Sequence, residues 1–139
     1  MDESQTYDIP SDCLYTKDHE WIRSSSTTTF LIGISDYASK MLNDIVYIAL
    51  PKEGTLLKQK EVFGQVESVK TVSDMFMPVS GKVKKINSKL NQAPELVSKS
   101  PYTDGWMMEI QSESYSSESK DLLGAEAYRK YVMSLDETD

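Results

Sequence analysis

One stretch of the chain decides its fold and draws attention to a single lysine: Val62-Phe63-Gly64-Gln65-Val66-Glu67-Ser68-Val69-Lys70-Thr71-Val72-Ser73-Asp74. Its β-branched and aromatic residues are typical of a strand, which Lys70 interrupts. Val69 and Val72 are expected to be buried, whereas Lys70 and Thr71 are not. A chain reversal at Lys70 and Thr71 would satisfy both requirements. Neither residue is the Asn or Gly that a tight primed turn prefers, so turn rules alone would let the strand continue.

A lysine in this position has a common structural explanation and a chemical one. Exposed lysines on strands and turns are frequent, and most have no special role. The lysine amine can also form a stable amide with a carboxylic-acid cofactor, and its four-carbon stem is flexible. Group carriers such as lipoamide and biotin perform their own chemistry while the protein presents them. The sequence around Lys70 supplies no set of catalytic partners that would favour an enzyme instead.

The rest of the chain is dominated by short predicted strands. We expect strands over residues 14–22, 28–34, 45–50 and 105–110. Trp106, Met108 and Ile110 should share one face of the last strand, and Gly33 should mark a close backbone approach. Because strands and helices do not alternate in a βαβ pattern, the sequence predicts a small β sandwich or barrel.

Helices are expected as accessories to these strands. A short helix over residues 35–42 would be capped by Ser35 and closed by Asn43 in a left-handed conformation. Residues 84–100 are expected to be helix or loop, with a helical turn beginning at Pro94–Val97. A polar linker over 112–120 would lead to an amphipathic helix over 121–135. The apolar stripe of that helix would consist of Leu122, Leu123, Tyr128, Tyr131, Val132 and Leu135.

The sequence also contains an internal repeat. The pattern Pro-x-x-Gly-x-aliphatic-x-Lys occurs at Pro51–Lys58 and again at Pro78–Lys85. Proline and glycine at this spacing form a turn, after which each strand resumes. Two such turns suit a pseudo-symmetric β fold in which the stretch between them carries Lys70 at its far end.

Length and composition limit the possible domain organisation, partners and location of the protein. The 139 residues fit one compact domain, which we place at 14–135, after a flexible lead-in at 1–13 and before an acidic tail at 136–139. The formal net charge of −7 argues against nucleic acid as a partner. The longest apolar run, residues 45–50, is too short to span a membrane. The acidic N-terminus has no presequence character, so we expect a cytoplasmic protein, or a mitochondrial-matrix protein whose presequence was removed.

The chain has one cysteine, Cys13, and one histidine, His19. An internal disulfide is therefore impossible, and a closed Cys/His zinc site cannot be built. Cys13 and His19 are the residue types of a nucleophilic pair, but we do not expect a catalytic one because no oxyanion motif accompanies them. No nucleotide-binding loop or nucleophile elbow occurs, and no metal site is expected.

Several segments together resemble the H protein of the glycine cleavage system. The stretch around Lys70 is similar to the lipoylation motif of that family. The other matching segments, in order, are Tyr15–Trp21, Ile32–Ala38, Asp44–Pro51, Pro78–Gly81, Pro94–Val97 and Pro101–Trp106. They extend over roughly residues 14 to 133, which makes the resemblance far more specific than one lysine motif.

The resemblance implies a mainly β fold: a lipoyl-type barrel-sandwich hybrid of two antiparallel sheets with accessory helices, including a C-terminal helix. It implies that Lys70 carries lipoic acid and that Glu67, Ser68 and Val69 are recognised by a lipoate ligase or lipoyl transferase. The protein would then be a monomeric carrier rather than an enzyme. It would shuttle the aminomethyl group of glycine between glycine decarboxylase, aminomethyltransferase and dihydrolipoamide dehydrogenase.

The aminomethyl cargo has a cationic amine and is sensitive to water, so a cleft that receives it should exclude solvent and offer carboxylates. Glu20 and Asp74, which lie in two of the matching segments, are the candidate cleft residues; each could equally be an ordinary solvated acid. His19 is expected to be packed or hydrogen-bonded rather than to act as a base.

Three other functions remain open at this point. An H-like protein could donate lipoyl groups to other lipoate-dependent complexes or serve a redox system. A biotin carrier would use the same kind of lysine, but its usual Ala-Met-Lys-Met is replaced here by Ser68-Val69-Lys70-Thr71. An unmodified binding scaffold with the same fold is the third.

Overall fold

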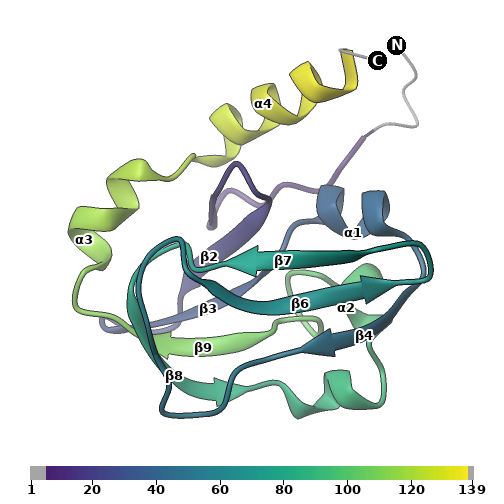
Figure 1. Ribbon diagram of the computed structural model, residues 1–139. Coiled ribbons are helices and arrows are strands. Elements are labelled where there is room, and N and C mark those ends of the chain that lie inside the picture. The colour runs from purple at the N-terminus through teal and green to yellow at the C-terminus, as the bar shows by residue number, and fades with distance from the viewer. Residues whose placement is uncertain (1–5, 138–139) are drawn as a thin grey trace.

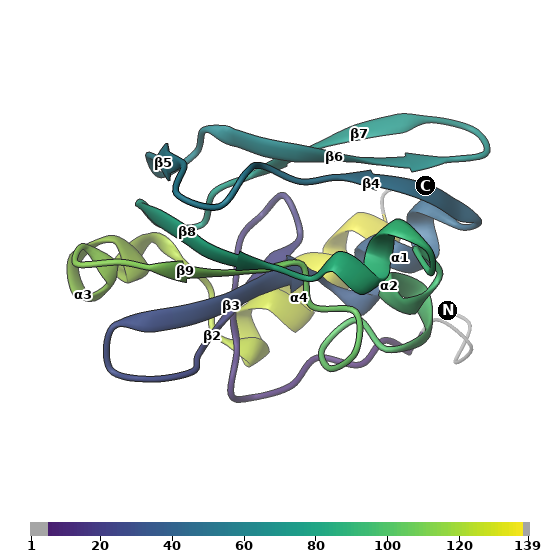
Figure 2. The ribbon, with the colours of Figure 1, turned by 90° about the horizontal axis from the view of Figure 1, so that it is seen from below.

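Two antiparallel sheets face each other in the computed structural model, which describes residues 6–137 (Figures 1 and 2). The larger sheet has six strands in the described residues: β1 (Leu14–Tyr15), β2 (Glu20–Ser24), β3 (Thr29–Ile34), β9 (Met108–Gln111), β8 (Gly81–Ile86) and β5 (Leu56–Leu57), in that spatial order. The smaller sheet has three: β4 (Ile45–Ala49), β6 (Val62–Ser68) and β7 (Val72–Phe76). This is the mainly β, two-sheet architecture that the sequence predicts.

Short helices connect the strands, and a longer one ends the described chain. They are α1 (Asp36–Leu42), α2 (Leu96–Lys99), α3 (Tyr115–Glu118) and α4 (Ala125–Glu137), with 3₁₀ turns at Ser88–Asn91 and Ser119–Asp121. Ser35 caps α1 as predicted, since its side chain accepts a hydrogen bond from the Ala38 N–H. Asn43 follows α1 with the positive φ expected of it, 54°, but its ψ of 159° lies outside the left-handed helical conformation that was predicted. Within residues 6–137, no helix is long and apolar enough to cross a membrane.

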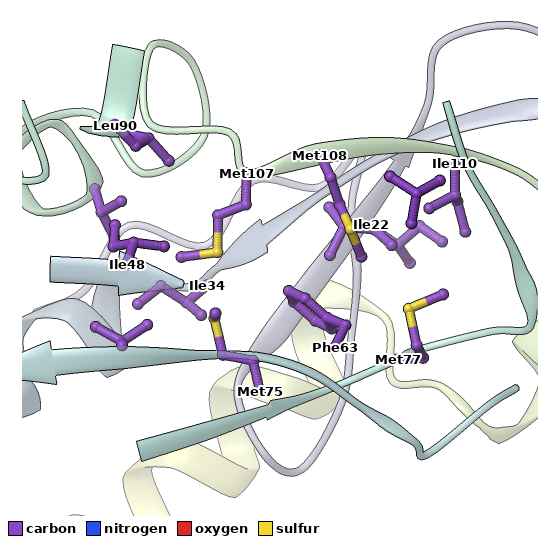
Figure 3. Packing of buried hydrophobic residues seen from close by; sticks show 14 of the residues in the cluster. Ile22, Ile34, Ile48, Phe63, Met75, Met77, Leu90, Met107, Met108 and Ile110 are labelled. Carbon is purple, nitrogen blue, oxygen red and sulfur yellow. The ribbon is translucent and has the colours of Figure 1, made fainter. Parts of the chain in front are cut away.

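The main core lies between the two sheets (Figure 3). The strand period of two directs alternate side chains into it. On β2, for example, Ile22 faces the smaller sheet while Trp21 faces the opposite side. Four methionines contribute to the core, and their flexible side chains suit its irregular spaces. These are Met75, Met77, Met107 and Met108.

A second buried cluster covers the other face of the larger sheet. Tyr15 of β1 stacks on Tyr128 of α4 with ring centroids 4.5 Å apart. Trp21 packs against Gly33 on β3, where an added Cβ would lie only 2.8 Å from the indole. The close approach expected at Gly33 is therefore present. The cluster attaches α4 to the sheet.

The described part of the lead-in belongs to this cluster. Ile9 and Cys13 are buried, the Asp8 N–H donates to Asp36 Oδ2, and the Tyr102 hydroxyl donates to the Asp8 carbonyl. The lead-in was expected to be flexible because it is polar, but from residue 7 to residue 13 it packs on the domain through its few apolar side chains. Residues 1–5 lie outside the described part of the chain. The predicted acidic tail also differs, because α4 continues to Glu137 and only 138–139 lie beyond the description.

The internal repeat forms one side of the molecule. The strands that follow its two turns, β5 and β8, pair antiparallel with Leu56 opposite Lys82. Gly54 has a φ of 91° and donates its N–H to the Val83 carbonyl, so the first turn is hydrogen-bonded to the second strand. In Figure 2, β5 lies at one end of the molecule and the β6–β7 connection at the other, which is the arrangement expected from the repeat.

Two element boundaries and one side-chain placement differ from the sequence predictions. The strand expected over 14–22 is divided by a turn in which His19 has a φ of 77°. The helix expected from 121 begins at Ala125, because Leu123 first pairs with Tyr15. Trp106 does not share a face with Met108 and Ile110; it precedes β9 and packs with the outer cluster, while Met107 enters the core.

Candidate functional site

Strands β6 and β7 form a hairpin (Figure 1). Lys70 lies at its tip, between Ser68 at the end of β6 and Val72 at the start of β7. The last paired residues are Glu67 and Val72, and the Ser68 N–H donates to the Thr71 carbonyl at 2.8 Å. Val69 and Lys70 are thus the two central residues of a tight turn. The Lys70 side chain is exposed, so its amine is free to be approached from outside the hairpin.

Ser68 stabilises this turn, which has neither the Asn nor the Gly that tight turns prefer. Its side chain is buried, and its hydroxyl oxygen accepts hydrogen bonds from the N–H groups of Lys70 at 3.3 Å and Thr71 at 3.2 Å. A serine hydroxyl that satisfies backbone donors in this way stabilises a turn without Gly or Asn. The Val69 N–H is also occupied, because it donates to the Asp44 carbonyl at 3.1 Å. The hairpin tip is therefore held both from within and from the corner after α1.

Both valines beside Lys70 are exposed, contrary to the sequence prediction. Val69 is 71% exposed and Val72 is 55% exposed. The prediction treated them as core-facing strand residues. Val69 instead occupies the turn, and Val72 starts β7 with its side chain on the outer face of the smaller sheet. Of the residues expected to be recognised by a ligase, Glu67 and Val69 are exposed and Ser68 is buried.

Glu20 is a buried carboxylate that joins the two sheets. It is 1% exposed at the start of β2, and its Oε2 accepts a hydrogen bond from the Phe76 N–H at the end of β7, at 3.0 Å. Its Oε1 accepts from the Thr16 hydroxyl at 2.5 Å. Burial raises the pKa of Glu20 from its ordinary value of 4.5 to about 7, although these hydrogen bonds act in the opposite direction.

A pocket of about 420 Å³ opens beside Glu20. Its apolar lining consists of Phe76, Met77, Pro78 and Leu122. The charged lining residues besides Glu20 are Asp18, Asp121, Lys17 and Lys60, and Thr16 and Gln59 complete the pocket. A pocket with an apolar wall and one buried carboxylate can hold a slender apolar chain that ends in a cationic group.

Asp74 lies elsewhere. It is exposed on the outer face of β7, where its Oδ1 accepts a hydrogen bond from Gln65 Nε2 at 2.9 Å. It is not among the residues that line the Glu20 pocket. The structure therefore does not bring the two expected cleft acids together, although β7 connects them, since Phe76 is two residues beyond Asp74.

The family of the chain follows from comparison with known proteins. The model of the family described as "Glycine cleavage H-protein" matches residues 13–135. The chain belongs to this H-protein family. It is 49% identical over 127 residues to the glycine cleavage system H protein of Mycobacterium tuberculosis, a match that covers 88% of this chain and 95% of that protein. It is 48% identical over 121 residues to the H protein of Salinibacter ruber, which covers 87% of this chain and 96% of the relative.

A solved structure gives the same result for the fold. The crystal structure of a glycine cleavage system H protein from Mycobacterium marinum superposes with a TM-score of 0.79 at 35% identity, covering 88% of this chain and 97% of that one. The H-protein fold is thus shared over nearly the whole described chain. The two sheets and the C-terminal helix expected from the resemblance are confirmed.

The remaining candidate groups of this H-protein family member have structural roles. His19 Nδ1 lies 2.8 Å from the Tyr128 hydroxyl, and burial lowers the pKa of His19. Burial also raises the pKa of the Cys13 thiol to about 11, so this cysteine is a poor nucleophile. Among residues 6–137, no group of three or more His, Cys, Asp or Glu side chains is arranged to hold a metal ion.

Sequence reasoning missed two contributors to the site. The first is the turn-forming role of Ser68, which the presence of a serine two residues before an exposed lysine could have suggested. The second is Asp44, whose contribution comes from its backbone carbonyl and a φ of 34° rather than from its side chain. No sequence pattern signals that contact, because it depends on how the corner after α1 meets the hairpin.

Proposed function

We propose that this chain is the lipoyl carrier of the glycine cleavage system, with lipoic acid bound as an amide to Lys70. The observation that carries the proposal is the exposed lysine at the tip of a hairpin whose turn is fixed by Ser68 and by the Asp44 carbonyl. Family membership over residues 13–135 gives that lysine its context.

The residues present fit a lipoyl group. An amide at Lys70 removes one positive charge. Because the Lys70 side chain is exposed, the modification would disturb no buried contact. When bound, the lipoyl group supplies the dithiolane chemistry that carries the aminomethyl group of glycine. The chain itself contributes a rigid base, a flexible lysine stem and a nearby pocket. We therefore propose a carrier subunit rather than an enzyme.

The proposed partners follow from this role. They are glycine decarboxylase, aminomethyltransferase and dihydrolipoamide dehydrogenase for the working cycle, and a lipoate ligase or lipoyl transferase for loading. We propose that Glu67, Ser68 and Val69 contribute to loading: Glu67 and Val69 through exposed side chains, and Ser68 by fixing the conformation of the tip. We also propose a monomer in the cytoplasm, or in the mitochondrial matrix if a presequence has been removed.

Glu20 is proposed as the acid that receives the cationic end of the cargo. Its carboxylate borders the pocket beside β7, and an ammonium group nearby would favour its ionised form. Apolar neighbours such as Met77 and Leu122 would limit the access of water. Asp74 is proposed as a second acid for the cationic cargo. It lies on the exposed side of β7, the strand that leads from Lys70 to the pocket.

Intact-mass analysis tests attachment at Lys70. The purified chain is incubated with lipoate, ATP and a lipoate ligase, and we expect one lipoyl adduct in the wild type and none in Lys70→Arg. Lys52→Arg removes another exposed lysine and should accept the adduct normally. A wild type that stays unmodified, or an adduct that persists in Lys70→Arg, would rule the proposal out.

Glycine–bicarbonate exchange then tests the role. The lipoylated chain is combined with glycine decarboxylase, and exchange above that of the Lys70→Arg chain is expected. A lipoylated chain that supports no exchange would instead favour the donor or redox role that the sequence left open.

A further inference from the structure

A strap of chain joins the last strand of the larger sheet to the C-terminal helix. We call residues 112–123, which run from the end of β9 through α3 toward α4, the strap (Figure 1). One end is held by the Ser112 N–H, which donates to the Thr28 carbonyl at 3.0 Å. The other end is held by Leu123, which pairs with Tyr15.

Between these two ends, Glu118 makes the hydrogen bonds that join the strap to the sheets. Its Oε1 accepts from the Ser80 N–H at 2.6 Å, and its Oε2 accepts from the Ser80 hydroxyl at 2.9 Å. Ser80 Oγ accepts in turn from the Gln59 N–H at 2.9 Å, and Gln59 Nε2 donates to the Glu118 carbonyl at 3.3 Å. We call Glu118, Ser80 and Gln59 the latch.

The latch lies at the border of the Glu20 pocket. Gln59 lines that pocket together with Asp121 and Leu122, which belong to the strap. Ser80 lines a second hollow of about 640 Å³, which does not include Glu20. The latch therefore lies between the two hollows, and it fixes the part of the strap that forms one wall of the Glu20 pocket.

The strap has other attachments, so the latch is not needed merely to hold it on the domain. Tyr115 of α3 stacks on Phe30 with ring centroids 4.1 Å apart, and both ends of the strap are hydrogen-bonded to strands or to their connection. What Glu118 adds is the position of the stretch that follows α3. Hydrogen bonds to a carboxylate are shorter and stronger than neutral ones, which suits a wall that must stay in place.

We infer that Glu118 is a positioning residue of the Glu20 pocket: through Ser80 it holds the strap in place as a pocket wall and keeps bulk water from the Glu20 carboxylate. The inference deepens the proposed function and rests on it for the nature of the cargo. Glu118 is not itself among the residues that line the pocket, so its effect passes through the strap and through Gln59.

The cargo gives this wall its purpose. Water that reached the aminomethyl group would break its C–S and C–N bonds. The carbon and the water oxygen would leave as formaldehyde, and the two water hydrogens would pass to the sulfur and to the nitrogen, which leaves as ammonia. No redox change occurs. A wall that excludes water slows this loss while the carrier travels between enzymes.

Three variants separate the latch from the charge of Glu118. Glu118→Ala opens the latch and keeps a good helix former in α3. Glu118→Gln removes the charge, but the amide can still accept from the Ser80 N–H and donate to Ser80 Oγ. Glu113→Ala removes an exposed carboxylate of the strap that does not line the Glu20 pocket. The readout is the ¹³C titration of the Glu20 carboxyl in the complete, unmodified chain.

We expect Glu118→Ala to move the pKa of Glu20 from about 7 toward its ordinary value of 4.5, because water would reach the carboxylate. In Glu118→Gln and Glu113→Ala it should stay near 7. The Phe76 N–H, which donates to Glu20, should exchange with solvent about tenfold faster in Glu118→Ala alone. Ammonia release from the lipoylated, aminomethyl-loaded carrier should rise in the same variant by about the same factor.

Each result has a distinct meaning. An unchanged Glu20 titration in Glu118→Ala overturns the inference and leaves the proposed function intact, because loading of Lys70 does not require the latch. An equal fall in Glu118→Gln also overturns it, since charge rather than the latch would then set the titration. If Glu118→Ala does not fold, Ser80→Ala breaks the same latch from its other side and gives the same decision. A wild type that cannot be lipoylated overturns the proposed function, while the titration of the unmodified chain still decides the inference.

Discussion

Replacing Glu20 by glutamine should change how the stability of the protein depends on pH. In the folded chain the pKa of Glu20 is raised to about 7, compared with 4.5 when it is solvated. Between these two values the folded state holds more protons than the unfolded state. Stability from this group is therefore greatest at low pH and falls as the pH rises toward 7. Glutamine has no proton to lose, so the variant should lack this component.

The size of the effect follows from the two pKa values. One pKa unit corresponds to 1.36 kcal/mol, so full ionisation of Glu20 costs about 3 kcal/mol of folding free energy. About 2 kcal/mol of that loss should fall between pH 5.5 and pH 8, a range that avoids strong acid. Wild type should thus lose about 2 kcal/mol more than Glu20→Gln across this range.

Urea unfolding at four pH values between 5.5 and 8 measures the difference directly. Glu67→Gln is the matched control, since it removes one carboxylate from an exposed position. The ¹³C chemical shift of the Glu20 carboxyl in the wild type gives a second measurement that needs no variant. A wild-type-minus-variant difference that stays constant with pH, together with a carboxyl that titrates near 4.5, would refute the reasoning.

Three further substitutions test the supports of the site. Ser68→Ala removes the hydroxyl that accepts from two turn N–H groups; we expect a loss of about 1 kcal/mol by urea unfolding and slower lipoylation, and an unchanged loading rate would contradict the role of the turn. Tyr128→Phe leaves the half-buried His19 nitrogen and the buried Ser35 hydroxyl without this partner and should cost about 1–3 kcal/mol, seen as a lower urea midpoint; equal stability would count against these contacts. Gly33→Ala places a methyl group 2.8 Å from the Trp21 indole and should cost about 1–3 kcal/mol with a changed tryptophan emission, whereas an unaltered spectrum would argue against the close packing.

The features that the sequence predicted correctly depend on local rules. Ser35 caps α1 because a serine before an apolar periodic segment satisfies the first free N–H groups of a helix. The paired turns at Gly54 and Gly81 follow from proline and glycine spacing, and the two strands they start do pair. Such features require only neighbouring residues, so a single sequence is enough to predict them.

The features that escaped prediction depend on contacts between distant segments. The turn at Lys70 is fixed by the buried Ser68 hydroxyl and by a carbonyl more than twenty residues earlier, so turn propensity could not indicate it. The exposure of Val72 depends on the strand register, because a shift of the strand by one residue would move each of its side chains to the opposite face of the sheet. The burial of Glu20 was equally invisible, because it depends on β2 meeting the end of β7.

The chemical identity of Glu20 is more informative than its position. A glutamine could accept the same hydrogen bond from the Phe76 N–H, and it would avoid the cost of placing a carboxylate at 1% exposure. Near neutral pH the buried acid is therefore a poorer structural link between the sheets than the amide would be. In the proposed role, a cationic cargo would add a positive charge to those of Lys17 and Lys60 in the lining, and its ammonium would stabilise the ionised form and recover part of that cost. The stability that glutamine is expected to restore thus measures the cost of ionising Glu20 in the folded chain, which a cationic cargo would have to offset in the proposed role.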